Sequence, residues 1–416
     1  MPRPTAWLLI AFLLVWHAFA VGGALREAQK SDHGRDYATY HYAAQVALDG
    51  GDPYSKRALG RAAQADGTRR SVFPFLYPPS FLLLAAPFSF LSLKAAYLLW
   101  FGLGEVALAG LATALSRWWG RHDPAVTVIV VGALAVTTLV PDNLLMGQAN
   151  LPVLALAVGG LALAEGRDGR RGLLGELGGG VLVGAAIALK LSPALLVGWW
   201  ILRLRWRPAL AALSTVLVLL GVSAAVFGPA HLLTFATSVL PTLSDGGYNG
   251  LGLPVALFGN HSIPNVWSQV FPADGPLLSP TARLASTATV LVLGVALLAT
   301  LGPPRDEDAA HAQLAGVMVF GLLVPVFTYE HHVIWAFPAV VLAILGVLRG
   351  RLHPFWAVPV GLAVAFWAAD LALLKRIARA ADPLTRGGLQ EGKFVALLVL
   401  LAAMVALGAA RWRRRR

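Results

Sequence analysis

Asp36 is the first residue of this sequence whose type and surroundings suggest chemistry. It follows the first apolar block, next to Arg35, and Tyr37, Tyr40 and His41 come after it at helical spacing. This spacing predicts an amphipathic helix at a membrane surface. A carboxylate in that position can act as a general base that takes the proton of a hydroxyl group. The alternative is a structural role, in which Asp36 caps the helix or pairs with Arg35.

Lys190 interrupts an otherwise apolar run and is followed closely by Pro193. An ammonium group in such a run is costly to bury, so by default it marks a functional site with an anionic partner. Pro193 predicts that the helix breaks at this point. The alternative without a functional role is that the Lys190 side chain extends (snorkels) to the membrane interface.

The segment 141–150 places amides and a carboxylate between two apolar blocks. Gln148 and Asn150 are its candidates for binding a ligand. A structural role is the alternative, with Asn143 and Asn150 as helix caps.

Tyr329, Glu330, His331 and His332 form a second polar segment between apolar blocks. A glutamate with two histidines suggests a metal site, but adjacent histidines on a helix point about 100° apart and cannot both reach one ion as an i, i+4 pair does. We therefore expect these histidines to bind a phosphate or a sugar rather than a metal.

Asn260 and His261 add another polar group, in the segment 258–262. Glycine-rich sequence precedes this segment, which suggests a mobile approach to it.

The elements that must position these residues are apolar. Hydrophobic residues make up 57% of the 416 residues and charged residues only 13%, whereas soluble domains have about 45–50% and 25%. The apolar residues form blocks of about 16–22 residues, which suits a bilayer core about 30 Å thick. We expect an all-α, polytopic membrane protein that forms a single domain over residues 1–416. The blocks lie near 7–25, 77–93, 95–116, 125–140, 150–165, 178–202, 208–227, 281–301, 311–327, 333–349, 354–374 and 394–411.

Two of these blocks, 77–93 and 178–202, contain prolines or Lys190 and are predicted to be re-entrant or broken. About ten to twelve transmembrane helices are therefore expected. The first block is either a cleaved signal peptide or an uncleaved anchor, and its length favours the anchor. Two long polar segments, 26–76 and 228–280, complete the predicted organisation, and the first carries amphipathic helices.

Basic clusters predict the orientation in the membrane, because loops rich in Lys and Arg stay in the cytoplasm. With the cytoplasmic clusters so placed, segments 26–76, 147–150, 228–280 and 329–332 all fall outside. One basic group contradicts the rule by falling outside as well: Lys375, Arg376, Arg379, Arg386 and Lys393. The clusters assigned to the cytoplasm contain Arg117 with Arg121, Arg167 with Arg170 and Arg171, Arg203 to Arg207, Arg349 with Arg351, and the tail 411–416.

Composition also excludes several classes of protein. The net charge is +12, but no water-facing segment carries a basic stripe interleaved with aromatic residues. The charge therefore does not indicate nucleic-acid binding. The chain has no cysteine, which rules out disulfides, thiolate nucleophiles and cysteine-ligated metals. P-loop, dinucleotide and Gly-x-Ser-x-Gly motifs are absent from the sequence.

Taken in order, the polar clusters resemble glycosyltransferase family 87. The resemblance covers residues 1 to about 350 and depends on the order and spacing of short motifs: Asp36-x3-Tyr40, Gly51-Asp52-Pro53-Tyr54, Tyr77-Pro78-Pro79, Gly147-Gln148-x-Asn150, Lys190-x-x-Pro193, Gly259-Asn260-x-Ser262 and His331-His332. It implies a GT-C type membrane enzyme that transfers a hexose, foremost mannose, from a polyprenyl-phosphate donor to a lipid or glycan acceptor outside the cytoplasmic membrane, with inversion.

The resemblance also implies roles for particular residues. Asp36 matches the catalytic carboxylate of the first outer loop, and His331 or His332 matches the histidine near the donor phosphate. The pattern departs at Tyr329-Glu330, where Ser or Thr with Trp is expected, so the equivalent histidine is ambiguous. We expect Lys190, Gln148 and Asn150 on the donor side, no metal or other cofactor, and acceptor or loop contacts from Tyr40, Tyr77, Asn260, His261 and Glu330.

The residues alone support the same chemistry. A lipid-phosphate leaving group needs cationic stabilisation, which Lys190 and the two histidines can supply, and an acceptor alcohol needs a base. The alternative hypothesis is a transporter or lipid-linked sugar flippase. The sequence shows no internal repeat of the kind that many transporters have. A structural scaffold would leave the polar residues unexplained.

Overall fold

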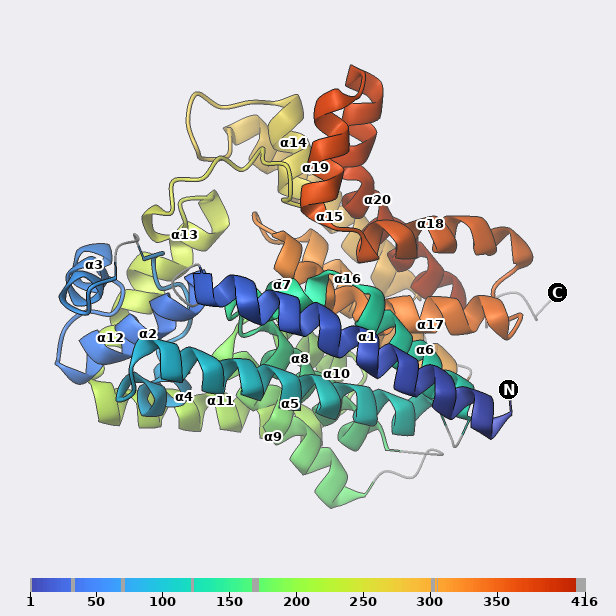
Figure 1. Ribbon diagram of the computed structural model, residues 1–416, viewed down its shortest axis with the longest axis horizontal. Coiled ribbons are helices and arrows are strands. Elements are labelled where there is room, and N and C mark those ends of the chain that lie inside the picture. The colour runs from blue at the N-terminus through green and yellow to red at the C-terminus, as the bar shows by residue number, and fades with distance from the viewer. Residues whose placement is uncertain are drawn as a thin grey trace. The chain divides into compact units, whose positions relative to one another are not determined.

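The computed structural model describes residues 2–30, 34–68, 72–120, 123–166, 172–300, 304 and 306–408. Most of these residues are helical, and their one β contact is an isolated bridge between Asn260 and Tyr329 (Figure 1). The predicted all-α class is confirmed. Some basic residues used for the predicted orientation lie outside the described residues: Arg121, Arg167, Arg170, Arg171 and the tail 411–416.

The helices follow one another with short connections. The ones labelled η are single 3-10 segments, apart from η1, which is a π-helix. In chain order they are α1 (Arg3–Lys30), α2 (Arg35–Leu48), α3 (Lys56–Ala65), α4 (Phe81–Ser89), α5 (Leu93–Gly120), α6 (Pro124–Val136), α7 (Leu139–Met146), α8 (Asn150–Glu165), α9 (Leu173–Leu189), α10 (Ala194–Leu202), α11 (Trp206–Phe227), α12 (Ala230–Thr234), η1 (Phe235–Val239), α13 (Leu240–Asp245), η2 (Tyr248–Gly250), α14 (Ile263–Val270), α15 (Pro280–Thr300), α16 (Glu307–Leu323), η3 (Glu330–Ala336), α17 (Phe337–Leu348), η4 (Pro354–Trp356), α18 (Ala357–Ala368), α19 (Leu371–Ala380) and α20 (Pro383–Gly408).

Several helices are long and apolar enough to cross a membrane. Among the described residues there are six, or eight when each of two bent helix pairs counts as one span. α8 and α9 are apolar but only 16 and 17 residues long. The predicted ten to twelve crossings are therefore reached, at the lower bound, only if both of these short helices also cross. The six are Arg3–Gln29, Leu93–Gly120, Trp206–Phe227, Pro280–Ala299, Glu330–Leu348 and Pro383–Gly408.

Both blocks that were predicted to be broken are short or interrupted. The block 77–93 forms only the nine-residue α4 before α5 begins at Leu93. The block 178–202 is split between α9 and α10, and Lys190 and Pro193 lie at the break. α2 is helical as predicted, but it buries ten of its residues and packs against α3, α4 and α5 instead of resting with one face open.

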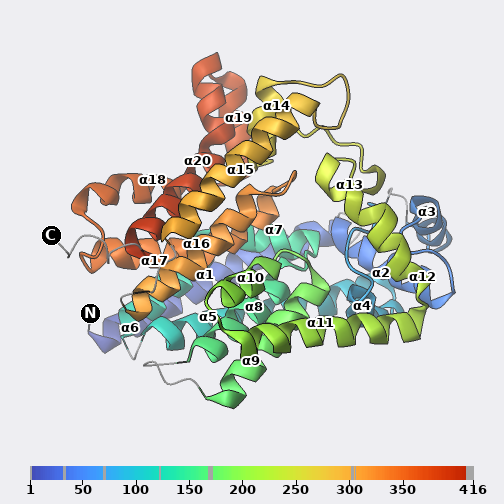
Figure 2. The same cartoon turned by 180° about the vertical axis from the view of Figure 1, so that it is seen from behind.

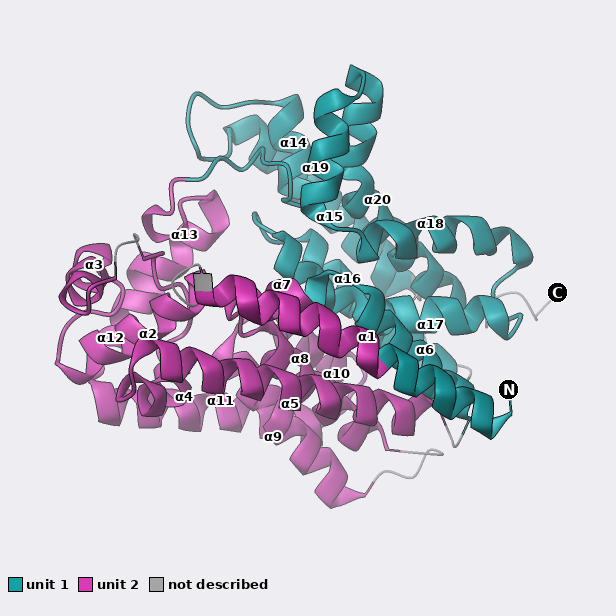
Figure 3. Cartoon of the chain, in the orientation of Figure 1, with its two compact units in different colours: residues 1–13, 123–140, 253–416 teal, residues 14–122, 141–252 magenta. Residues whose placement is uncertain are grey.

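The described chain divides into two compact units (Figure 3). Unit 1 comprises residues 1–13, 123–140 and 253–416, and unit 2 comprises residues 14–122 and 141–252. The single domain over residues 1–416 stays a prediction.

Unit 2 is built around α8 and α9, which pack against each other and against α5 and α11 (Figures 1 and 2). A Cβ atom at Gly160 of α8 would lie 2.6 Å from the carbonyl oxygen of Gly179 in α9. Glycine therefore allows the two backbones to approach closely, as small residues do between membrane helices.

Unit 1 is built around α20, which packs against α16, α17, α18 and α19. The two bent helix pairs meet at their breaks. Thr138, between α6 and α7, donates from its hydroxyl to the carbonyl oxygens of Ala368 and Ala369, at 3.3 and 3.2 Å. These contacts satisfy carbonyl groups that the end of α18 leaves without helical partners.

Candidate active site

The Asp36 carboxylate lies in the first turn of α2 in unit 2 and is partly buried. Gln148 donates from Nε2 to Asp36 Oδ2 at 2.6 Å. Tyr77 donates from its hydroxyl to Gln148 Oε1 at 3.4 Å, and the Tyr40 and Tyr77 hydroxyl oxygens are 2.6 Å apart. An ionised carboxylate only accepts hydrogen bonds, so it fixes the orientation of the Gln148 amide. The chain of donors then runs from Tyr40 through Tyr77 and Gln148 to Asp36.

Packing around α2 explains why Gln148 reaches this carboxylate. The Tyr37 ring packs at 5.5 Å from Trp100 and 6.0 Å from Tyr97 between ring centroids. Gly147 lies against the same tyrosine with φ of +68°, and a Cβ atom there would be 2.5 Å from Tyr37 Cβ. Only glycine fits both the left-handed conformation and this close approach. The turn between α7 and α8 can therefore press against α2 and bring Gln148 to Asp36.

Lys190 lies in extended backbone just after α9. Its Nζ donates to Asn150 Oδ1 at 2.6 Å and lies 5.6 Å from the centroid of the Tyr77 ring. Asn150 is fully buried and donates from Nδ2 to Asn143 Oδ1 at 3.0 Å. The amide of Asn150 is therefore used to hold Lys190 and not to cap α8. We call Asp36, Gln148, Tyr77, Tyr40, Lys190 and Asn150 together the Asp36 network.

Burial raises the pKa of Asp36 to about 6, against the opposing effects of the Gln148 hydrogen bond and the charges of Lys190 and Arg35. The carboxylate is therefore mostly ionised at neutral pH, yet it is a stronger base than an exposed aspartate. Burial also raises the pKa of Tyr40 and of Tyr77, so both hydroxyls stay protonated as donors.

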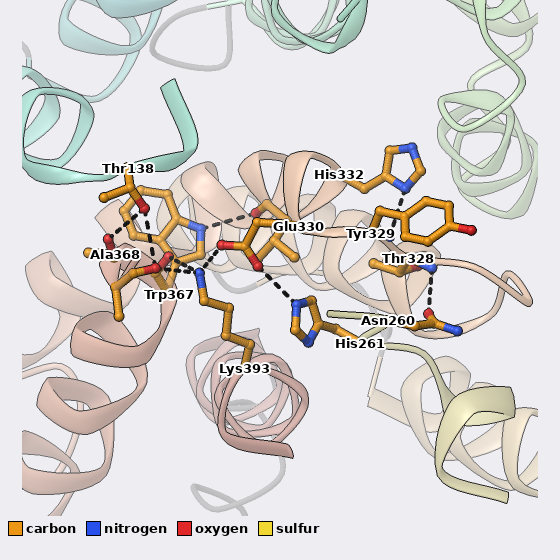
Figure 4. Close-up of polar contacts among 12 residues, drawn as sticks. Thr138, Asn260, His261, Thr328, Tyr329, Glu330, His332, Trp367, Ala368 and Lys393 are labelled. Carbon is orange, nitrogen blue, oxygen red and sulfur yellow. Dashed lines mark hydrogen bonds and ion pairs between the residues drawn. The ribbon is translucent and has the colours of Figure 1, made fainter. Parts of the chain in front are cut away.

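A second polar group lies in unit 1 around Glu330 (Figure 4). His261 Nε2 is 3.0 Å from Glu330 Oε2, and Lys393 makes an ion pair with Glu330 Oε1. Lys393 also donates to the carbonyl oxygen of Ala369 at 2.7 Å. We call His261, Glu330 and Lys393 the Glu330 cluster. Because both carboxylate oxygens are engaged by potential cations, Glu330 is poorly placed to accept a proton from a substrate.

Asn260 joins the segment 253–262 to the segment 326–329. Its Nδ2 donates to the carbonyl oxygens of Val255 and Val326 at 3.0 and 2.9 Å, and its Oδ1 accepts from the Thr328 amide at 2.8 Å. Ser262 donates from its hydroxyl to Val326 at 2.9 Å. Asn260 therefore makes the loop contacts that hold these two segments together, and an acceptor contact stays a prediction.

The histidine pair, His331 and His332, comes just after the segment 326–329 in the chain. His331 and His332 are half-buried, and their ring centroids are 4.4 Å apart. His332 Nδ1 accepts from the backbone amide of Tyr329 at 3.2 Å, so a neutral His332 carries its proton on Nε2. The pair stands beside the Tyr329 ring, as Figure 4 shows for His332.

The predicted site residues thus form two groups, one in each unit. The Asp36 network holds six of them, and the other five are Asn260, His261, Glu330, His331 and His332. The sequence did not identify Lys393 as a member of the site, because it was grouped with water-facing cations. Its position next to an apolar block, with Glu330 near another one, was the available signal, since charges at such positions need partners.

No three His, Cys, Asp or Glu residues in the described part of the chain are arranged to hold a metal ion. Metal-independent chemistry stays a prediction.

The sequence profile of glycosyltransferase family 87 matches residues 75–325. A polyprenol-phosphate-mannose-dependent alpha-(1-2)-phosphatidylinositol mannoside mannosyltransferase of Mycolicibacterium smegmatis is 26% identical over 335 residues, which are 74% of this chain and 71% of that protein. A pentamannoside mannosyltransferase of Mycobacterium tuberculosis, also polyprenol-phosphate-mannose-dependent, is 27% identical over 292 residues, which are 69% of this chain and 62% of that protein.

Among solved structures, ArnT from Cupriavidus metallidurans bound to undecaprenyl phosphate aligns with a TM-score of 0.47 and 12% identity, over 98% of this chain and 77% of that one. The family profile covers more than half of the chain, and the described residues form the apolar helices of a multi-pass membrane protein. The chain belongs to glycosyltransferase family 87.

Proposed function

We propose that this membrane glycosyltransferase moves a hexose, foremost mannose, from a polyprenyl-phosphate donor to a hydroxyl group of a lipid or glycan acceptor, on the extracytoplasmic side. Asp36 is the general base. The observation that carries the proposal is the Asp36 carboxylate, held by Gln148, with burial raising its pKa to about 6. The relatives named above use polyprenol-phosphate mannose, which supports the choice of donor.

The transfer is a direct displacement with inversion. The acceptor oxygen attacks the anomeric carbon of the sugar while its proton passes to Asp36, and the bond from that carbon to the phosphate oxygen breaks. The polyprenyl phosphate leaves with an added negative charge. A base contributes most when its pKa lies near the working pH, which fits a carboxylate with a pKa of about 6.

Lys190 stabilises the leaving phosphate in this proposal, and a donor-side role for His331 and His332 stays a prediction. Asn150 holds the Lys190 ammonium at 2.6 Å, next to the Tyr77 ring. A fixed cation is effective because it needs no reorganisation when charge develops on the leaving group. Gln148 also orients the base in this proposal, since its amide donates to Asp36 Oδ2. Donor binding by Gln148 stays a prediction.

Two observations support the extracytoplasmic side. In unit 2, Asn150 begins α8, and Glu165 at its other end pairs with Arg205 at 2.6 Å. A helix of 16 residues separates the two ends by about 24 Å. If the basic cluster that contains Arg205 is cytoplasmic, the Asn150 end faces outside.

The span Glu330–Leu348 gives the same result in unit 1, because Arg349 and Arg351 follow its far end. The first polar segment also contacts the second within unit 2. Asn249 donates from Nδ2 to the Tyr54 carbonyl at 3.0 Å, and Lys56 donates to the Gly250 carbonyl at 3.3 Å. The two long polar segments therefore share one side of the membrane in this part of the chain.

The test measures transfer from radiolabelled polyprenyl-phosphate mannose, with membranes as the source of acceptor and chromatography of lipid and glycan products. Asp36→Asn keeps the shape of the side chain but removes the base, so turnover is expected to fall about 10²- to 10⁴-fold while donor binding is retained. Asp49→Asn, in an exposed turn of the same segment, is the matched control. Near-normal turnover of Asp36→Asn together with a loss of turnover in Glu330→Gln would assign the base to Glu330.

A further inference from the structure

The helix α19 turns sharply away from the apolar helix that precedes it. The pair Pro354–Ala368 and Leu371–Ala380 is bent by 102° at its break, and α19 lies beside the start of α20 (Figures 1 and 2). If Pro354–Ala368 crosses the membrane, a helix at about a right angle to it runs along the membrane surface. α19 is therefore positioned as an interfacial helix.

Three faces of α19 have different chemistry, as the helical advance of 100° per residue separates them. Leu374 and Ala378 form one face and are buried, and α19 packs against α20. Leu373 and Ile377 form a second stripe and are 44% and 47% exposed. The third face, which we call the α19 cationic face, consists of Lys375, Arg376 and Arg379. Exposed apolar residues beside a basic face are typical of helices that lie in a lipid interface.

The acids near α19 are engaged elsewhere. Asp370 accepts from the Leu373 amide at 2.5 Å, and Asp382 accepts from the Leu384 and Thr385 amides at 3.0 and 3.1 Å. Glu391 accepts from the Gln269 side chain at 2.8 Å. In the part of the chain that the structure describes, no ion pair joins an acid to the α19 cationic face.

The transfer reaction proposed above does not use these cations, and the positive-inside rule does not explain them. In the predicted orientation these residues fall on the outer side, where the rule expects fewer basic residues. Lys393, from the same basic group, is buried in the Glu330 cluster and so is accounted for. Arg386 donates to the carbonyl oxygens of Ala378 and Ala381 at 3.1 and 3.3 Å. The α19 cationic face is what remains of the group, and an anionic membrane surface would complement its charge.

We infer that α19 binds the phosphate groups of anionic phospholipids in the surrounding leaflet through Lys375, Arg376 and Arg379, with Leu373 and Ile377 inserted among the acyl chains. Charge complementarity and the exposed apolar stripe favour a lipid over a soluble phosphate, which would use only the cations.

The bound lipid would also touch the segment that carries His261. Lys375 Nζ lies 5.7 Å from the centroid of the Phe258 ring. A Cβ atom at Gly259, which has φ of +105°, would lie 3.0 Å from the Leu371 side chain. α19 therefore contacts the segment that Asn260 holds against residues 326–328.

The experiment measures lipid retained by the purified full-length chain, without donor, so that its outcome is independent of turnover. Protein equilibrated with phosphatidylglycerol and phosphatidylcholine is analysed by native mass spectrometry. Each cation near an anionic surface strengthens binding by about fivefold. The triple variant K375Q/R376Q/R379Q is therefore expected to lose retained phosphatidylglycerol by about tenfold or more, with phosphatidylcholine unchanged.

The matched control is K56Q/R57Q/R61Q, which removes three exposed cations from the short helix α3. That helix has no large exposed apolar residue, so retention should stay within about twofold of the parent chain. Equal losses in the two triple variants would overturn the proposal, because they would indicate binding by net charge alone.

A second measurement does not depend on the folding of the triple variant. The chain has no cysteine, so Ile377→Cys can carry one polarity-sensitive fluorophore, with Gln64→Cys on α3 as the water-facing control. The Ile377 label should emit at shorter wavelength in phosphatidylglycerol nanodiscs than in phosphatidylcholine nanodiscs, and about 1 M salt should remove the difference. An Ile377 spectrum equal to that of Gln64, or insensitive to lipid charge, would refute lipid binding. A spectrum that responds to added inorganic phosphate instead would assign the face to a soluble anion.

Discussion

At the scale of single residues, the environment of Asp36 makes activity depend on pH in a defined direction. The base must be ionised to act, and burial raises its pKa to about 6. The value of kcat/KM is therefore expected to fall about tenfold per pH unit below pH 6 and to be level above it. The measurement is the pH dependence of kcat/KM for mannose transfer in detergent.

The Gln148 hydrogen bond allows a second test of the same pH dependence. It stabilises the charged carboxylate and so lowers the pKa of Asp36. Gln148→Met removes that hydrogen bond, raises the pKa and should move the acid limb to higher pH. Gln64→Met, at an exposed position on α3, is the matched control and should leave the limb in place. If the acid limb of Gln148→Met stays at the same pH or moves to lower pH, the pH dependence does not come from ionisation of Asp36.

Residue types selected candidate side chains, but they did not predict what each of these side chains contacts. Asp36 and Lys190 stood out because a carboxylate near a membrane span and an ammonium in an apolar run are unusual. Nothing in the sequence indicated that Gln148 contacts Asp36, since the two lie 112 positions apart. Lys393 was missed because it was grouped with water-facing cations, and its partner Glu330 lies 63 positions away.

At the scale of elements, the turn between α7 and α8 determines whether Gln148 reaches Asp36. Gly147 has φ of +68° and leaves no room for a Cβ atom next to Tyr37. Gly147→Ala should lower the free energy of unfolding by about 1–3 kcal/mol beyond the strain of the left-handed conformation, and it should reduce turnover by displacing Gln148. Thermal unfolding in detergent and a transfer assay measure the two effects.

Gly50 provides the control for that substitution. It has φ of +74°, and a Cβ atom there would meet nothing within 4 Å. Gly50→Ala carries the conformational strain without the clash, so the difference between the two variants isolates the contact with Tyr37. Equal losses of stability would show that the close approach of Gly147 to α2 does not contribute to the free energy of unfolding.

Helix positions could be predicted wherever an apolar run had polar boundaries. The block 150–165 coincides with α8, Asn150–Glu165, and the block 208–227 differs from α11 by two residues at its start. The start of α20 was missed, because residues 383–393 mix charged and polar residues with three glycines and form no continuous apolar run, yet α20 begins at Pro383. The packing of α2 was missed because its tyrosines read as one face of a surface helix, whereas nearly all of its length is enclosed.

At the scale of the whole molecule, the orientation in the membrane decides which substrates the enzyme meets. A donor carried on a polyprenyl phosphate is used where both its phosphate and the acceptor hydroxyl are accessible. Basic clusters predict that the Asn150 end of α8 and the Glu330 end of the span Glu330–Leu348 face outside. Both groups of candidate site residues would then work on the same side, although each belongs to its own compact unit.

Cysteine labelling tests this orientation directly, because the chain has no cysteine of its own. Gln64 is exposed on α3 in the first polar segment, and Arg349 is exposed just after α17, at the opposite end of the span that begins at Glu330. In intact cells an impermeant maleimide should label Gln64→Cys and should label Arg349→Cys only after the membrane is permeabilised, because the basic residues around Arg349 keep that loop in the cytoplasm. Labelling of Arg349→Cys in intact cells with protection of Gln64→Cys would invert the topology. Asp36 would then face the cytoplasm, and the donor and acceptor would have to be sought there.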